Sequence, residues 1–147
     1  MGALIPSVLA TISHKEINYM SEFLEIVQAL VTIDINREPT PETPYELRKA
    51  WDRVEEAGKK DSEGVWDVLR NGTEYEFSAL CNCIPEIGGE FYDDDNLCEI
   101  MQIARKRLEN PQNHLYLMDG IQGLFGRGEM FDKYWKATEP ANTEPDT

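Results

Sequence analysis

The chain has 147 residues, of which 41% are hydrophobic, and its formal net charge at pH 7 is −14. A chain of this length forms one ordinary domain with a single core, and its apolar content excludes a wholly disordered protein. Nucleic acid and anionic membrane surfaces would repel a protein of this charge. We therefore expect one globular domain that binds neither of them directly and whose partners are basic.

The sequence contains no recognisable export or membrane segment. No apolar run approaches the roughly 20 residues that cross a bilayer. The apolar residues 1–12 lack the positively charged start and the small-residue cleavage site of a secretory signal. Three cysteines, an odd number, are a poor basis for a disulfide framework. These features predict a soluble, cytoplasmic protein with reduced thiols.

The first helix is predicted from a capping box of Ser13 and Glu16 to about Asp34, because apolar residues recur at spacings of three and four between them. A helix that begins at Thr43 and Pro44 follows, again from a capping box, in this case with Glu46. It is expected to stop at Gly58, where glycine suits a left-handed C-terminal residue. A short helix over about residues 62–70 should end at Asn71-Gly72.

The segment after Gly72 is predicted to be helical, although its sequence also has a strand-like feature. Thr73 and Glu76 form a third capping box, and an apolar face continues from there to Pro85, which should end the helix. Aromatic and acidic residues alternate over residues 74–77, as they would in a strand. We favour the helix.

Two glycine pairs divide the remainder of the chain. Gly88 and Gly89 begin a loop that reaches residues 93–95, and a helix to about Leu108 follows, with acids in its first turn and bases in its last. A helix from about Asn113 contains Gly120 and Gly123, which we expect to allow close helix packing. A bend at Gly126 and Gly128 should precede a final short helix.

The expected architecture is therefore a single all-α domain of five to seven helices over residues 1–136. Residues 137–147 contain the sequence Thr-Glu-Pro twice and have nothing to bury. We expect them to form a disordered acidic tail. The oligomeric state does not follow from the sequence.

The cysteines do not form a metal-binding pattern. Ligand pairs in structural zinc sites are spaced two to four residues apart, whereas Cys81 and Cys83 have one residue between them and would point to nearly opposite sides of a helix. We interpret both, and Cys98, as small core residues, and expect no metal and no cofactor. A cysteine-dependent enzyme, with one of these thiols paired to His114, remains an alternative that no local motif supports.

The three consecutive aspartates 93–95 do not follow the alternating order of a calcium-binding loop. Capping of the following helix by Asp94 or Asp95 explains them better.

The most informative feature is the uneven distribution of charge: residues 61–100 hold eleven acidic side chains and one basic side chain, Arg70. A solvated acidic surface that only maintains solubility is the plain interpretation. The more specific hypothesis is a continuous surface that occupies a basic groove on another protein by imitating the phosphate charge of DNA. Its predicted partner-binding residues are Asp61, Glu63, Asp67, Glu74, Glu86, Glu90, Tyr92, Asp93, Asp94 and Asp95.

Tyr92 is included because Phe91 and Tyr92 lie in an acidic, glycine-containing loop and are expected to be exposed. The sequence thus predicts a non-enzymatic acidic protein that inhibits a nucleic-acid-binding protein, in the manner of small phage-encoded inhibitors of bacterial defence or transcription. The alternative is a toxin-neutralising immunity protein or small adaptor, with Tyr92 as an aromatic hot spot.

Overall fold

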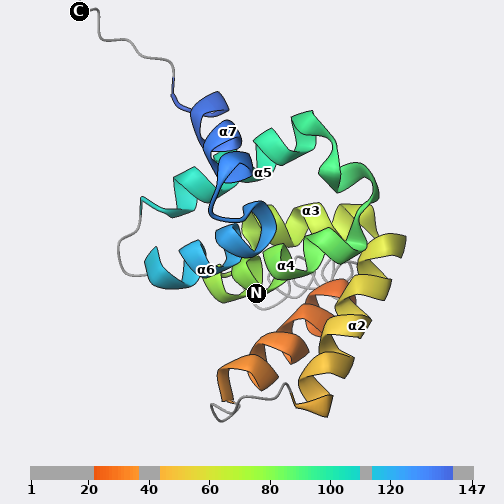
Figure 1. The fold of residues 1–147 in the computed structure, drawn as a ribbon. Coiled ribbons are helices and arrows are strands. Elements are labelled where there is room, and N and C mark those ends of the chain that lie inside the picture. Colours follow the sequence, from red (N-terminus) through yellow and green to blue (C-terminus); the bar gives the residue numbers. More distant parts are fainter. Residues whose placement is uncertain (1–21, 37–43, 110–113, 141–147) are drawn as a thin grey trace, which may run out of the picture.

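The computed structural model describes residues 22–36, 44–109 and 114–140, and every regular element in these ranges is helical. The predicted all-α class is therefore confirmed. The described residues begin with a helix over 22–36, and the described ranges contain six further α-helices and one 3₁₀ helix, η1 (Figure 1). Their bounds are α2 Tyr45–Lys60, α3 Ser62–Asn71, α4 Glu74–Ile87, η1 Gly89–Tyr92, α5 Asp94–Arg107, α6 His114–Phe125 and α7 Glu129–Ala137.

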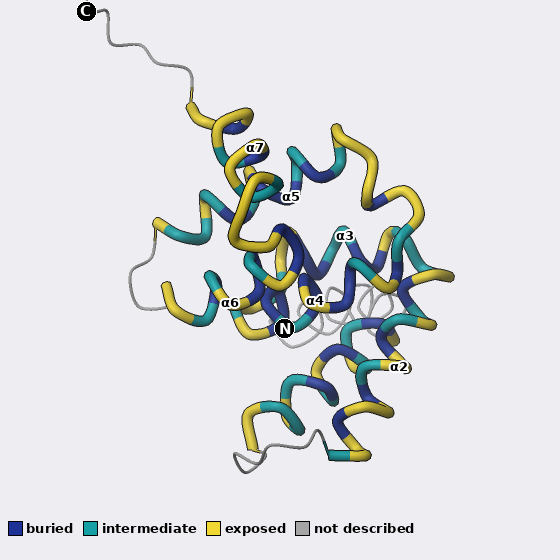
Figure 2. The backbone as a smooth tube through the Cα atoms, in the orientation of Figure 1, coloured by how far each residue is buried: buried dark blue, intermediate teal, exposed yellow. Residues whose placement is uncertain are grey.

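The helix α4 lies at the centre of the fold and contacts α2, α3 and α6. Its side chains Phe77, Leu80 and Ile84 are completely buried, and Figure 2 shows the buried positions along the helix. Burying a side chain of this size contributes about 1.5–3 kcal/mol. The core thus fixes α4 in the fold, and the two ends of α4 place acidic residues in two different surroundings.

The other helices surround α4. The 22–36 helix lies beside α2, so that Ile26 and Ile33 share a hollow with Ala50 and Arg53. α7 packs on α5 on the far side of the fold from this pair. No helix in the described ranges has the length and apolar character needed to cross a membrane.

Close contact between α4 and α6 depends on glycine, as the sequence predicts. A Cβ atom on Gly120 would lie 2.5 Å from the Cα atom of Ser78, and one on Gly123 would lie 1.8 Å from Oδ1 of Asn82. Gly126 has φ +78°, so the predicted bend after α6 also uses a backbone conformation that glycine favours.

The predicted capping box at the start of α4 is present and is extended by a third residue. The backbone N–H of Glu76 donates to Oγ1 of Thr73 at 3.1 Å, and that of Thr73 donates to Oε1 of Glu76 at 2.9 Å. Nε2 of Gln28 in the 22–36 helix donates to the other oxygen of the Glu76 carboxylate at 3.1 Å. This arrangement pairs a carboxylate that is almost fully buried, and it settles residues 74–77 as helix rather than strand.

The predicted C-terminal end of α2 is wrong, and its predicted start is only partly described. Pro44, predicted at the first helical position, is the N-terminal cap, and the predicted cap Thr43 lies outside the described residues, as do Ser13 and Glu16. Gly58 does not end the helix, which continues to Lys60. Its role is steric, because a Cβ there would lie 2.5 Å from Cδ1 of Ile87.

The predicted stop of α4 at Pro85 is also wrong. Proline removes one helical N–H, yet the helix continues for two more residues and buries Ile87 in the core. The stop is Gly88, which has φ +63° and donates its N–H to the carbonyl oxygen of Ile84 at 2.8 Å. The apolar contact of Ile87 and the conformation of Gly88 together override the proline.

Residues 137 and 138, which were predicted to belong to the disordered tail, are part of the helical fold. Ala137 is the last residue of α7, and Thr138 is buried. Oγ1 of Thr138 donates to the carbonyl oxygen of Tyr134 at 2.7 Å and accepts from Nε of Arg105 at 3.1 Å. Arg105 also lies over the ring of Trp135, 3.7 Å from its centroid, which anchors the end of α7 on α5. Residues 141–147 lie outside the described residues.

Candidate functional site

The start of α3, the end of α4, η1 and the start of α5 meet at one end of the molecule, which is on the right in Figure 1. Oγ of Ser62 donates to Oε2 of Glu90 at 2.9 Å, and this bond ties the start of α3 to η1. Nδ2 of Asn96 donates to the carbonyl oxygen of Glu90 at 2.8 Å, which ties η1 to α5. Acidic residues that are far apart in sequence are therefore neighbours here.

Glu86 is the electrostatic centre of this region. Burial, and after it the negative charge of Glu86, raises the pKa of the Glu55 carboxyl on α2. The same two causes raise the pKa of the Tyr92 hydroxyl in η1. Glu55 and Tyr92 thus each lie within electrostatic reach of Glu86. We call this surface the acidic end, and define it by Glu55, Asp61, Glu63, Glu86, Glu90, Tyr92, Asp93, Asp94 and Asp95.

Two of the predicted partner-binding residues do not belong to the acidic end. Glu74 is in the first turn of α4, at the opposite end from Glu86, and forms an ion pair of 3.2 Å with Arg107. Asp67 lies in the second half of α3, where its Oδ1 accepts from Nδ2 of Asn71 at 2.9 Å. Both carboxylates have partners within the fold.

Two residues of the acidic end act as helix caps. The side chain of Asp61 caps α3 by accepting from the N–H of Gly64 at 2.9 Å. Asp93 caps α5 by accepting from the N–H groups of Asp95 and Asn96 at 2.9 and 3.3 Å. The predicted cap, Asp94 or Asp95, is therefore wrong by one or two positions. Because η1 ends at Tyr92, α5 begins earlier in the chain than predicted, and Asp93 is its cap.

Asp94 faces α7. Its Oδ1 accepts a hydrogen bond from the hydroxyl of Tyr134 and lies 3.4 Å from Nζ of Lys133. The hydrogen bond from Tyr134, and after it the charge of Lys133, holds the pKa of the Asp94 carboxyl below its usual range. The hydrogen bond also raises the pKa of the Tyr134 hydroxyl. Asp94 is therefore paired within the fold, although its side chain is exposed.

Only one residue of the predicted aromatic pair is exposed. Tyr92 is 44% exposed, whereas Phe91 is buried, with its ring centroid 5.5 Å from that of Trp66. The four residues of η1 make a tight turn that directs successive side chains to opposite sides. Tyr92 is thus an accessible aromatic side chain within a surface of carboxylates.

Glu55 is a member of this region that its sequence position does not indicate. It lies outside residues 61–100 and precedes Glu86 by 31 positions, so no local pattern connects them. The signal that could have found it is the pairing of α2 with α4, which depends on the close approach of Gly58 and Ile87.

The cysteines have the environment of core residues. Cys81 and Cys83 are buried, and burial raises the pKa of both thiols strongly. Cys98 is partly exposed, and its pKa is raised by burial and by the charges of Asp94 and Asp95. An activated thiol needs a lowered pKa. Within the described ranges, no three histidine, cysteine or acidic side chains are grouped so that they could hold a metal ion.

Comparison of the chain with protein-family models, with curated proteins and with solved structures gives no match in any of the three.

Proposed function

We propose that this protein is a non-enzymatic acidic binding protein whose acidic end occupies the basic groove of a nucleic-acid-binding protein and thereby inhibits it. DNA carries one negative charge per about 1.7 Å of its axis, and the acidic end presents carboxylates from several helix ends on one surface. A basic groove that evolved to bind phosphates would attract such a surface.

One observation carries the proposal: the acids at this end are largely free of basic partners. Glu63, Glu86 and Asp95 form no ion pair with any residue in the described ranges, and Asp94 is paired with Lys133. A charge without an internal partner is available to an external one.

The test is an affinity capture from host lysate at low and high ionic strength, with the captured protein then assayed for nucleic-acid binding. The diagnostic variant combines Glu63→Gln, Glu86→Gln and Asp95→Asn, because these side chains form no hydrogen bond with any residue that the structure describes. The matched control, Glu46→Gln with Glu109→Gln and Asp132→Asn, removes the same charge from other exposed positions.

The proposal expects capture of a nucleic-acid-binding protein that duplex DNA displaces and that high salt weakens. The diagnostic variant should lose this capture, while the control variant keeps it. If both variants behave alike, or if DNA does not compete, the acidic end is not imitating nucleic acid.

The exposure of Tyr92 among carboxylates also favours a second function, that of an immunity protein or adaptor in which Tyr92 is the binding hot spot. Substitution of Tyr92 distinguishes the two functions. With charge spread over many contacts, Tyr92→Ala should weaken binding only slightly. With a hot spot, the same substitution should cost at least about 2 kcal/mol of binding free energy, and salt should matter less.

A further inference from the structure

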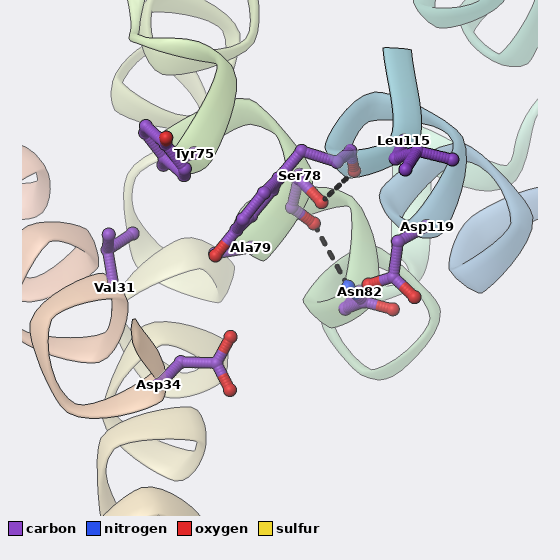
Figure 3. Close-up of a pocket in the computed structure, with 9 residues that line it drawn as sticks. Val31, Asp34, Tyr75, Ser78, Ala79, Asn82, Leu115 and Asp119 are labelled. Carbon is purple, nitrogen blue, oxygen red and sulfur yellow. Dashed lines mark hydrogen bonds between the residues drawn. The ribbon is translucent and has the colours of Figure 1, made fainter. Parts of the chain in front are cut away.

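A hollow of about 250 Å³ lies between the 22–36 helix, α4 and α6. Figure 3 shows Asp34 on one side of it, Asn82 and Asp119 on the other, and Tyr75 at its edge. The carboxylate of Asp34 points away from its own helix toward the side where Asn82 and Asp119 lie. We call this hollow the tyrosine groove, because the ring of Tyr116 also lines it.

The floor of the tyrosine groove is held in place by one hydrogen bond between α4 and α6 and one within α4. Oγ of Ser78 donates to the carbonyl oxygen of Tyr116 at 2.9 Å, and Nδ2 of Asn82 donates to the carbonyl oxygen of Ser78 at 3.1 Å. Gly120 allows the two helices this close approach. The groove is therefore built on two closely packed helices, and the Ser78 hydroxyl is held against the backbone of α6.

The aromatic part of the groove is a pair of tyrosines. The rings of Tyr75 and Tyr116 meet edge to face, at an interplanar angle of 82° with their centroids 4.4 Å apart. Tyr75 is 43% exposed, so its ring remains accessible. Aromatic faces attract cations, most strongly where water is partly excluded.

The charge of the lining has one sign. Its residues include two carboxylates, Asp34 and Asp119, and no basic side chain among the described residues. The pKa of the Tyr116 hydroxyl is raised by burial and then by the negative charges of Asp34 and Asp119, so the field of both reaches the aromatic pair. Leu115, at the edge, is 85% exposed and offers an apolar contact.

We propose that the tyrosine groove binds the guanidinium group of an arginine side chain presented by a partner protein. A guanidinium is planar, stacks on aromatic rings and donates two parallel hydrogen bonds to a carboxylate, whereas a lysine ammonium is a compact and strongly hydrated charge. The alkyl part of the arginine side chain suits Leu115. The volume holds such a group but not a drug-sized ligand, whose pockets begin at about 300 Å³.

The groove adjoins the acidic end along α4, because Asn82 precedes Glu86 by four residues and such residues share a helix face. One basic partner could therefore contact both surfaces. The assignment of the arginine to the partner of the acidic end rests on the proposed function. The chemistry of the groove rests only on its own lining.

The test is an NMR titration of the full chain with N-acetyl-arginine-methylamide, followed through the side-chain amide of Asn82 and the rings of Tyr75 and Tyr116. Saturable shifts are expected with the arginine compound and smaller shifts with its lysine analogue. None is expected with the citrulline analogue, which has a similar shape and no charge. Asp119→Asn should weaken arginine binding about tenfold, which is about 1.4 kcal/mol, and Asp132→Asn on α7 should leave it unchanged.

Equal shifts with citrulline and arginine, or an affinity that Asp119→Asn does not change, would overturn the assignment. This titration needs no partner protein, so its result is independent of the capture experiment. If arginine binds the groove and the capture fails, the groove stands and the proposed function falls. If the capture succeeds and arginine does not bind the groove, the groove assignment is rejected and the proposed function of the acidic end stands.

Discussion

Arg107 and Gly72 join α5 to the turn between α3 and α4: Nη2 of Arg107 donates to the carbonyl oxygen of Gly72 at 2.8 Å. The same nitrogen donates to the carbonyl oxygen of Leu69 at 3.0 Å, and Nη1 pairs with Glu74. The guanidinium lies 4.8 Å from the centroid of Phe77, and its Nε is buried with no hydrogen-bond partner in the described ranges. One side chain therefore donates hydrogen bonds to backbone carbonyl oxygens at the end of α3 and pairs with a carboxylate at the start of α4.

Replacing Arg107 should destabilise the fold strongly. Arg107→Ala leaves two carbonyl oxygens and a largely buried carboxylate without their donor, and we expect the free energy of unfolding to fall by about 3 kcal/mol. Urea unfolding followed by circular dichroism measures this change. Lys106→Ala, at an exposed neighbouring position, is the control and should change stability by about 0.5 kcal/mol or less. A loss of similar size in both variants would mean that the Arg107 contacts contribute little.

The two glycines of α6 should respond differently to alanine. At Gly120 the new Cβ meets the backbone of Ser78, which cannot move without displacing α4, so we expect a loss of about 2 kcal/mol. At Gly123 it meets the end of the Asn82 side chain, which can rotate, and alanine also favours the helix by about 1 kcal/mol. Gly123→Ala should therefore be close to neutral. Thermal unfolding of both variants compares them, and equal losses would contradict this account.

The hydrogen bond from Tyr134 to Asp94 should stabilise the fold only over a range of pH, with a lower limit set by Asp94 and an upper limit set by Tyr134. The bond holds the pKa of Asp94 below its usual value, so its contribution is present above the unfolded pKa of about 3.9 and is lost as the pH falls through the folded value. It raises the pKa of Tyr134, so the contribution is present below about pH 10 and is lost as the pH rises through the folded value. The difference in unfolding free energy between the wild type and Tyr134→Phe should therefore be largest between about pH 5 and 9. A difference that is constant from pH 2 to 11 would show that the hydroxyl does not act through Asp94.

The three thiols should react at very different rates. Cys81 and Cys83 are buried and their pKa values are strongly raised, so neither should react with a thiol reagent at pH 8 in the native protein. Cys98 is partly exposed and should react slowly, since its pKa is also raised. Titration with a disulfide reagent should count one thiol in buffer and three in denaturant. Rapid native labelling of Cys81 or Cys83 would instead revive the cysteine-dependent enzyme.

The sequence predicted the start or end of a helix correctly where the residues that determine it lie within one helical turn. The Thr73 and Glu76 capping box is chemistry within one turn, and it appeared where it was predicted. The ends that were wrong depend on contacts between distant residues. Gly58 and Pro85 have sequence features of helix ends, but the approach of Ile87 to α2 and the conformation of Gly88 determine where the two helices stop.

The candidate site was less predictable for the same reason. The acidic residues can be read from the sequence, but their availability cannot. Glu74 is paired with Arg107, which lies 33 residues farther along the chain, whereas Glu86, at the other end of α4, is not. Nor could the sequence bring Asp34 and Asp119 to one groove, because that depends on how the 22–36 helix and α6 pack on α4. The charge of each residue is local information, whereas its availability to a partner is a property of the fold.

The two ends of α5 differ in charge, and this has a consequence for the speed of association. Asp94 and Asp95 lie in its first turn and Arg105, Lys106 and Arg107 in its last, about 20 Å away along a 14-residue helix. In the field of a basic partner, such an arrangement experiences a torque that turns the acidic end forward before any contact is made. Fewer collisions would then be misoriented, and the association rate would fall steeply as added salt shortens the range of that field.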